Sequence, residues 1–152
     1  MNNTELYEFA AEFRSTIEGL GQSKFAGTSL ASSNFPAACC DDASILLAKF
    51  LEENGYREVN LIHGSSGGEN KDINSHDWLL VDCTIVDITA DQFNWKNYSN
   101  HPVIIQEQSA FHLTFVQENK GPALATERAI QNKVNFNFDY QEIKNNIDDR
   151  AT

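Results

Sequence analysis

Basic residues are scarce in this 152-residue chain, and long hydrophobic runs are absent. Eleven Lys and Arg stand against 22 Asp and Glu, which gives a formal net charge of −11. A surface of this sign repels nucleic acid and anionic lipid, so we expect neither as a partner. The longest apolar runs are about four residues, too short to cross a membrane. The first residues also lack the basic and apolar stretches of a secretory signal, so we expect a cytoplasmic protein.

Cysteine is scarce too, with only Cys39, Cys40 and Cys83. An odd number that includes an adjacent pair makes a poor disulfide framework, because neighbouring cysteines bridge only with strain. Zinc is not expected, because adjacent cysteines reach one ion less well than a Cys-x-x-Cys pair does. The glycine-rich segment at residues 64–68 lacks the lysine of a P-loop, so we expect no nucleotide site there. We therefore expect free thiols, no metal and no cofactor.

The composition is otherwise that of an ordinary globular protein, with 41% hydrophobic and 22% charged residues. Such a composition argues against disorder, and the length corresponds to one domain with one core. We therefore expect a single domain over residues 1–152. Its polar tail, from about residue 145, is expected to fray.

Apolar spacing predicts two helices in the first third of the chain. Residues 5–20 carry apolar side chains three and four positions apart, as in an amphipathic helix. Residues 21–38 lack this period and contain Pro36, so we expect a long loop. The second helix begins at the capping carboxylates that follow Cys40, and it ends at Asn54 and Gly55.

The remainder of the chain is dominated by strand patterns. Candidate strands lie at residues 57–63, 76–81, 84–89, 103–106, 111–117 and, from its alternation, 134–140. The second and third of these form a hairpin, and both are apolar on two faces, as in the middle of a covered sheet. Residues 64–75 are expected to be a mobile surface loop and residues 123–132 a short helix. Helices followed by an antiparallel sheet predict an α+β fold.

Three residues fall where a reactive centre can form. Cys40 directly precedes the second helix, where unpaired N–H groups and the helix dipole favour a thiolate and can hold an oxyanion. A hairpin turn centred on residues 82–83 places Trp78 opposite Asp87. His76 and Asp87 are then diagonal neighbours on one face, about 7–8 Å apart, which side chains can close. A slip of one residue would place Asp87 on the other face.

Cys40, His76 and Asp87 match a nucleophile, a base and a group that orients the base. The carboxylate would fix the imidazole tautomer, and the imidazole would ionise the thiol. Asp41 and Asp42 oppose this ionisation unless their carboxylates point away. Cys39 stays an alternative nucleophile, since the helix could begin one residue earlier.

Other residues near these motifs have weaker assignments. Trp78 is expected beside the His–Asp pair, shielding it from water, and is a candidate for substrate binding. Gln92 is a weaker candidate for lining the cleft. His63, His101 and His112 lack ligand-like spacing, so we expect them to be structural or exposed.

Two segments resemble bacterial transglutaminase-like cysteine enzymes. They are FPAACCDDAS at 35–44, followed by leucines of the second helix, and HDW at 76–78 with VDITADQF at 86–93. The resemblance covers roughly residues 5–93. The family usually has a small residue after the nucleophile, where this chain has Asp41, and often a glycine in the hairpin turn, where it has Cys83.

This resemblance implies a papain-like, transglutaminase-core-like fold, with N-terminal helices packed on an antiparallel sheet. It implies Cys40 as nucleophile, His76 as general base and acid, and Asp87 as the orienting residue. The expected activity is acyl-group chemistry on an amide, as in a peptidase, deamidase, amidase or acyl transferase. The substrate would be a protein, a peptide or a small amide. The alternatives are a non-catalytic binding or immunity-type domain of the same fold and a toxin or effector domain.

Overall fold

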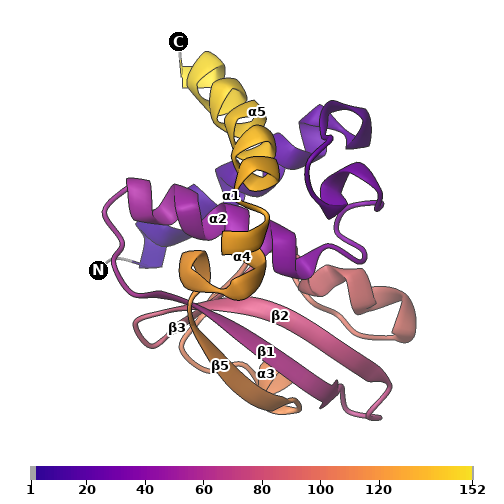
Figure 1. The fold of residues 1–152 in the computed structure, drawn as a ribbon. Helices are drawn as coiled ribbons and strands as arrows, with labels where there is room; N and C mark the ends of the chain where they lie inside the picture. The colour runs from indigo at the N-terminus through magenta and orange to yellow at the C-terminus, as the bar shows by residue number, and fades with distance from the viewer. Residues whose placement is uncertain (1–2, 152) are drawn as a thin grey trace.

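The computed structural model describes residues 3–151, with side chains up to residue 147 (Figure 1). The helices are α1 (Asn3–Leu20), α2 (Cys40–Glu53), α3 (Ala110–Leu113), α4 (Glu127–Gln131) and α5 (Lys133–Ala151). The strands are β1 (Val59–Gly67), β2 (Ile73–Val81), β3 (Thr84–Asp87), β4 (Ile104–Gln106) and β5 (Val116–Pro122). Short 3-10 turns lie at 22–24, 29–31, 90–96 and 123–125, the third being η3 (Ala90–Lys96).

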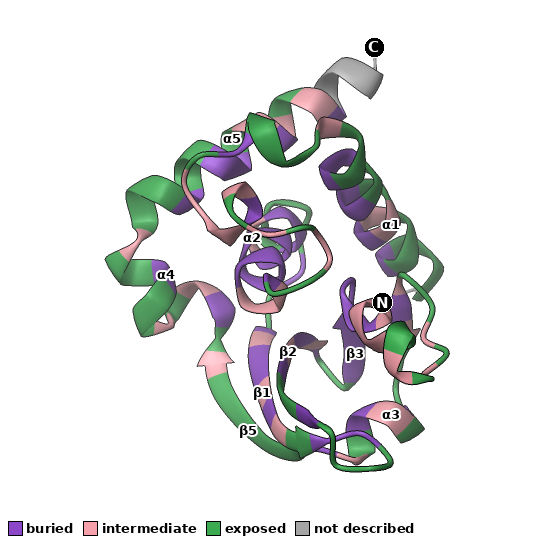
Figure 2. Ribbon diagram, turned by 90° about the vertical axis from the view of Figure 1, so that its right-hand side faces the viewer, coloured by how far each residue is buried: buried purple, intermediate pink, exposed green. Residues whose placement is uncertain are grey.

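The strands form one antiparallel sheet in the order β4-β3-β2-β1-β5. Helices α1, α2 and α5 lie on one side of it, and the short α3 lies on the other (Figures 1 and 2). The α+β class expected from the sequence is therefore confirmed. The central position of β2, with β3 beside it, agrees with their apolar character on both faces.

The main core lies between the three long helices and the sheet. Helix α2 is buried along most of its length, because its apolar residues recur at helical spacing: Ala43, Leu46, Leu47, Phe50 and Leu51. A second apolar cluster, centred on Trp78 and Phe115, lies apart from this core. The two clusters hold β2 and β3 between them, so the side chains of the hairpin have fixed surroundings.

The hairpin has the predicted register. Leu79 pairs with Val86, Leu80 with Ile85 and Val81 with Thr84. The turn is formed by Asp82, at φ 55, and Cys83. Continuing this register places Asp87 opposite Trp78, so His76 and Asp87 share one face of the sheet.

The predicted mobile loop at 64–75 is wrong in its extent, because β1 runs to Gly67 and β2 begins at Ile73. The glycines there serve close packing. A Cβ at Gly64 would lie 2.8 Å from the Phe115 side chain, and one at Gly67 would lie 2.1 Å from its ring. Both distances are too short for a real contact, so these glycines let an aromatic ring pack directly on the strand.

The predicted last strand at 134–140 is also wrong, because these residues belong to α5. The buried side chains Phe136, Tyr140, Ile143 and Ile147 recur at helical spacing and join the main core. Val134 and Phe138, which complete the alternation, are exposed. Residues 145–151, part of the tail that is expected to fray, belong to α5, and residue 152 lies outside the described residues.

Residues 111–117 differ from the single strand expected there. They contribute most of α3 and the start of β5. Ser109 caps this helix by accepting a hydrogen bond from the backbone N–H of His112. The turn of α3 brings His112 inward, where it is fully buried.

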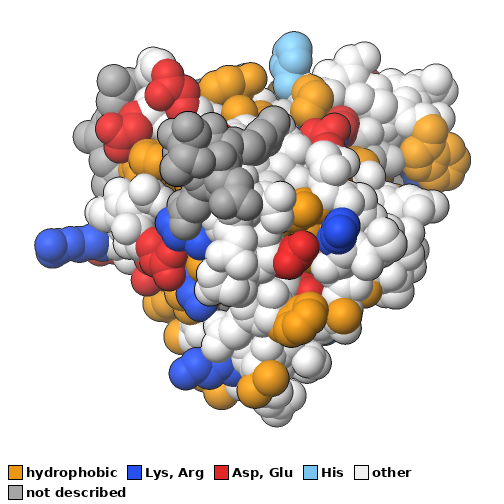
Figure 3. Space-filling model, turned by 90° about the horizontal axis from the view of Figure 1, so that it is seen from above, with side chains coloured by type: hydrophobic (Ala, Val, Ile, Leu, Met, Phe, Trp, Pro, Cys, Tyr) orange, Lys and Arg blue, Asp and Glu red, His pale blue; other side chains and the backbone are white. Residues whose placement is uncertain are grey.

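In the view of Figure 3, hydrophobic side chains lie in separate groups among charged side chains of both signs. Among residues 3–151, no helix combines the length and apolar character needed to span a bilayer.

Candidate active site

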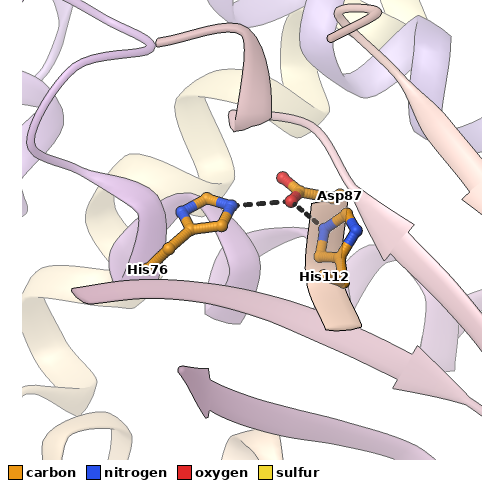
Figure 4. A group of neighbouring side chains, drawn as sticks. All are labelled: His76, Asp87 and His112. Carbon is orange, nitrogen blue, oxygen red and sulfur yellow. Dashed lines mark hydrogen bonds and ion pairs between the residues drawn. The ribbon is translucent and has the colours of Figure 1, made fainter. Parts of the chain in front are cut away.

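His76 and Asp87 form a fully buried pair. The imidazole Nε2 lies 2.6 Å from Asp87 Oδ2, a hydrogen bond between side chains that are 0% and 1% exposed. Asp87 Oδ1 accepts a second bond from the backbone N–H of Thr89 at 2.9 Å. The carboxylate is thus anchored at both oxygens, and Figure 4 shows the His76 ring directed at it.

His76 and Asp87 shift each other's pKa. Burial lowers the pKa of His76, but the Asp87 carboxylate, with a smaller contribution from Cys40, outweighs burial and raises it above its usual range. Burial alone would raise the pKa of Asp87. The charge of His76 and hydrogen bonds from two imidazoles instead hold that pKa well below its usual range. The favoured state is therefore an imidazolium beside a carboxylate.

Cys40 is the first residue of α2, is partly buried, and lies close enough to His76 to influence its ionisation. The remaining imidazole nitrogen, Nδ1, forms no hydrogen bond to any part of the described chain. No other buried side-chain nitrogen or oxygen in residues 3–147 lacks a hydrogen-bond partner. Because unpaired buried polar atoms are costly, an unpaired imidazole nitrogen near a thiol makes His76 a candidate functional residue.

The other two cysteines occupy different surroundings. Cys39 is completely buried in the main core, and burial, followed by the charges of Cys40, Asp42 and Asp41, raises the pKa of its thiol to about 12. Cys83 is exposed in the hairpin turn. A buried thiol with so high a pKa stays protonated, so these surroundings favour Cys40 over Cys39 as the nucleophile.

Arg128 engages both acidic residues that follow Cys40. Asp42 is buried, and its carboxylate accepts bonds from Arg128 and from the backbone N–H and hydroxyl of Ser29. These donors lower the pKa of Asp42 although burial opposes them. Asp41 Oδ2 lies 3.2 Å from Arg128 Nε. Arg128 therefore offsets negative charge that would otherwise oppose a thiolate at Cys40.

The first turn of α2 supplies free backbone donors. Asp41 Oδ1 accepts from the N–H of Asp42, and the Cys39 carbonyl accepts from the N–H of Ala43. The N–H groups of Cys40 and Asp41 precede the first intrahelical bond and have no acceptor within the helix. They are suited to hold an oxyanion that forms at a carbonyl attacked by Cys40.

His112 belongs to the site, although its sequence position suggested a structural or exposed residue. Its Nε2 lies 2.7 Å from Asp87 Oδ2, the same oxygen that binds His76, and its Nδ1 lies 2.6 Å from Ser109 Oγ. Two imidazoles thus converge on one carboxylate oxygen (Figure 4). No local pattern could indicate this, because His112 lies 25 residues beyond Asp87 in a four-residue helix.

Aromatic rings enclose His76. Trp78 and Phe93 lie 5.6 Å and 5.1 Å from its ring, and Phe111 and Phe115 lie 6.3 Å and 6.0 Å away, between centroids. Trp78 is 1% exposed, which agrees with the expected shielding of the pair from water. The same burial leaves Trp78 little surface for direct contact with a substrate.

Gln92, the weaker candidate for the cleft, is partly buried in η3. Its amide Nε2 donates to the Thr89 carbonyl at 2.9 Å, and its Oε1 accepts from the N–H of Ala38 at 3.4 Å. The second contact joins η3 to the loop that leads into Cys39 and Cys40. Gln92 therefore contacts the segment that directly precedes the two cysteines.

His76, Asp87 and His112 offer three atoms that could also surround a metal ion. Both N···O distances are those of hydrogen bonds, at 2.6 and 2.7 Å. Two ligands of a tetrahedral zinc ion lie about 3.3 Å apart, given bonds of about 2.0–2.1 Å. The described arrangement is therefore a hydrogen-bonded cluster, contracted relative to a metal site.

Comparison with known proteins shows no matching family model, no matching curated protein and no matching solved structure.

Proposed function

We propose that the chain is a cysteine enzyme that attacks the carbonyl of an amide or thioester through Cys40. The supporting observation is the fully buried His76, bound through Nε2 to Asp87 while Nδ1 lies unpaired near a partly exposed thiol. In this arrangement Asp87 selects the tautomer that directs the second nitrogen to the thiol. It also stabilises the imidazolium formed when that nitrogen takes the thiol proton.

Each chemical step uses a group in the site. In the resting site the proton of the Cys40 thiol has already moved to His76 Nδ1, and on attack the thiolate forms a bond to the carbonyl carbon while the carbonyl π electrons move to oxygen. The N–H groups at the start of α2 hold that oxyanion. His76 then protonates the leaving nitrogen or sulfur as its bond to carbon breaks, which leaves an acyl-enzyme. Finally, His76 removes a proton from water or an amine that displaces Cys40.

The same placement supports a papain-like, transglutaminase-core-like assignment for the fold. A helix that begins at Cys40 lies against an antiparallel sheet whose adjacent strands carry His76 and Asp87. The substrate class within this proposal is a protein, a peptide or a small amide. Hydrolysis, deamidation and acyl transfer share the first half of the reaction.

The proposal is tested with 4-nitrophenyl acetate, an activated ester that acylates reactive thiols. We expect a burst of nitrophenolate and one acetyl group on Cys40, located by mass spectrometry. Cys83, which is exposed in the hairpin turn, serves as the internal reference for an ordinary thiol. His76→Ala should abolish the burst, and Cys39→Ala should retain it.

Acetylation of Cys40 no faster than that of Cys83 would contradict the enzyme proposal. The chain would then be better described as the non-catalytic binding or immunity-type domain. A burst that survives Cys40→Ala and disappears in Cys39→Ala would assign the nucleophile to Cys39 instead.

A further inference from the structure

Asp87 Oδ2 is shared by two histidines. His76 Nε2 lies 2.6 Å and His112 Nε2 lies 2.7 Å from this oxygen, whereas Oδ1 is occupied by the N–H of Thr89. All three side chains are buried, so water does not compete for the oxygen. The two imidazoles therefore donate hydrogen bonds to the same carboxylate oxygen and compete for its lone pairs.

The hydrogen bonds define the tautomer of His112. An ionised carboxylate only accepts, so Nε2 carries a proton in both rings. In neutral His112, Nδ1 is then an acceptor, and the Ser109 hydroxyl donates to it at 2.6 Å. That oxygen also accepts, at 3.4 Å, from the backbone N–H of His112. Ser109 thereby holds the ring with its Nε2–H aimed at Asp87.

We propose that His112 is a positioning residue. By donating a second hydrogen bond to Asp87 Oδ2, it weakens the hydrogen bond from His76 and so limits the basicity that Asp87 confers on His76. A second donor on an acceptor oxygen weakens the attraction of that oxygen for the first donor. Without this limit, His76 would hold its proton too tightly to release it to a leaving group. The proposal depends on the proposed function in one respect, the identification of His76 as the acid and base.

The titratable groups that act on His76 come from three elements: Cys40 on α2, Asp87 on β3 and His112 on α3. Replacing Cys40 by alanine removes the first of them. In a Cys40→Ala chain, Asp87 and His112 are the two of these groups that remain, and burial of His76 is unchanged. This background separates the role of His112 from the reactivity of the thiol.

The test is an NMR titration of the imidazole nitrogens in the Cys40→Ala chain. The His76 signal is identified by its loss in His76→Gln. A matched pair of amides replaces His112. In His112→Gln, the amide nitrogen reaches the position of Nε2 and still donates to Asp87, whereas in His112→Asn it reaches only the position of Nδ1.

We expect His112→Asn to raise the titration midpoint of His76 by about one pH unit, a tenfold change in its ionisation constant. His112→Gln should keep the midpoint near that of the parent. Ser109→Ala changes little volume and should move the midpoint in the same direction by less, because His112 loses the bond that strengthens it as a donor.

An unchanged or lowered midpoint in folded His112→Asn would overturn the proposal, as would equal effects of the two amides. If His112→Asn does not fold, an unchanged midpoint in Ser109→Ala overturns it. Failure of the enzyme proposal has a different signature, since it appears as an unreactive Cys40 in the otherwise unmodified chain. Either result can therefore occur without the other.

Discussion

The most informative single substitution is Asp87→Asn, which removes one charge with almost no change in shape. The carboxylate accepts from His76 Nε2 at 2.6 Å, His112 Nε2 at 2.7 Å and the Thr89 N–H at 2.9 Å. An amide has only one oxygen. If that oxygen still accepts hydrogen bonds from both imidazoles, the new NH2 group faces the N–H of Thr89, which is also a donor. The buried hydrogen bond to Thr89 is then lost, at a cost of about 1–3 kcal/mol.

The electrostatic effect is larger. A unit charge about 4 Å from the imidazolium centre contributes about 4 kcal/mol at an effective dielectric constant of about 20. This corresponds to a change of about 3 units in the pKa of His76. The pKa of His76, which the carboxylate raises to about 10, then falls to about 7, so about half of the imidazoles are neutral at pH 7. Cys40 then has a weaker cationic partner, so the midpoint of its alkylation should move to a higher pH than in wild type.

The assay is the rate of iodoacetamide labelling of Cys40 as a function of pH. The midpoint is the readout rather than the plateau, because a more basic thiolate is also intrinsically more nucleophilic. Asp77→Asn is the matched control, since Asp77 bonds His63 Nδ1 at the same distance of 2.6 Å on the neighbouring position of β2. A folded Asp87→Asn chain with the wild-type midpoint would refute the reasoning, whereas Asp77→Asn should keep that midpoint.

Three further outcomes follow from the same contacts. Asp42→Asn should lower the free energy of unfolding by about 2 kcal/mol in urea titrations, because the charged hydrogen bonds to Arg128 and Ser29 are lost. The loss is limited because Arg128 is half exposed. An unchanged free energy of unfolding would show that the Asp42–Arg128 ion pair is not formed. Since the folded pKa values of Asp42 and Asp87 lie below the unfolded ones, their stabilisation is complete above about pH 4 and is lost as the pH falls through the folded values. Thermal unfolding from pH 7 to 2 should show this decline, and a flat profile would contradict it. A chelator should leave Cys40 labelling unchanged, because Asp87 is hydrogen-bonded in the cluster; a loss restored by zinc would establish a metal site instead.

The β2–β3 hairpin is the part of the fold that the sequence predicts in most detail. Residues on a strand alternate between faces, so once the turn was centred on Asp82 and Cys83, the pairing of both strands followed. That register put His76 and Asp87 on one face, and the structure joins them by a hydrogen bond. Local capping chemistry predicts the start of α2 to within one residue, since the helix begins at Cys40 and not at the following carboxylates, and its N-cap Cys39 makes no side-chain capping bond.

Long-range contacts could not be predicted in this way. His112 reaches Asp87 through a four-residue helix with no periodicity of its own. Arg128, which offsets the charge beside Cys40, lies 86 residues from Asp42. Neither position has a local signal, because each is determined by how distant segments pack.

Ambiguous patterns explain the remaining errors. Phe136 and Tyr140 satisfy both an alternating strand and a helical face, and only Ile143 and Ile147 extend the helical face. The glycines near residues 64–68 look like a flexible loop, although two of them lie in β1 because Phe115 packs against them. Composition alone does not distinguish a glycine needed for flexibility from one needed for space.

The central claim is a thiolate at Cys40 that depends on His76. The most direct measurement is iodoacetamide labelling of the native chain at pH 6, with each cysteine quantified by mass spectrometry in wild type and in His76→Ala. We expect Cys40 to label well ahead of the exposed Cys83 and the buried Cys39, and His76→Ala to remove that advantage. Labelling of Cys40 only above about pH 8.5, or equally fast in both chains, would contradict the claim.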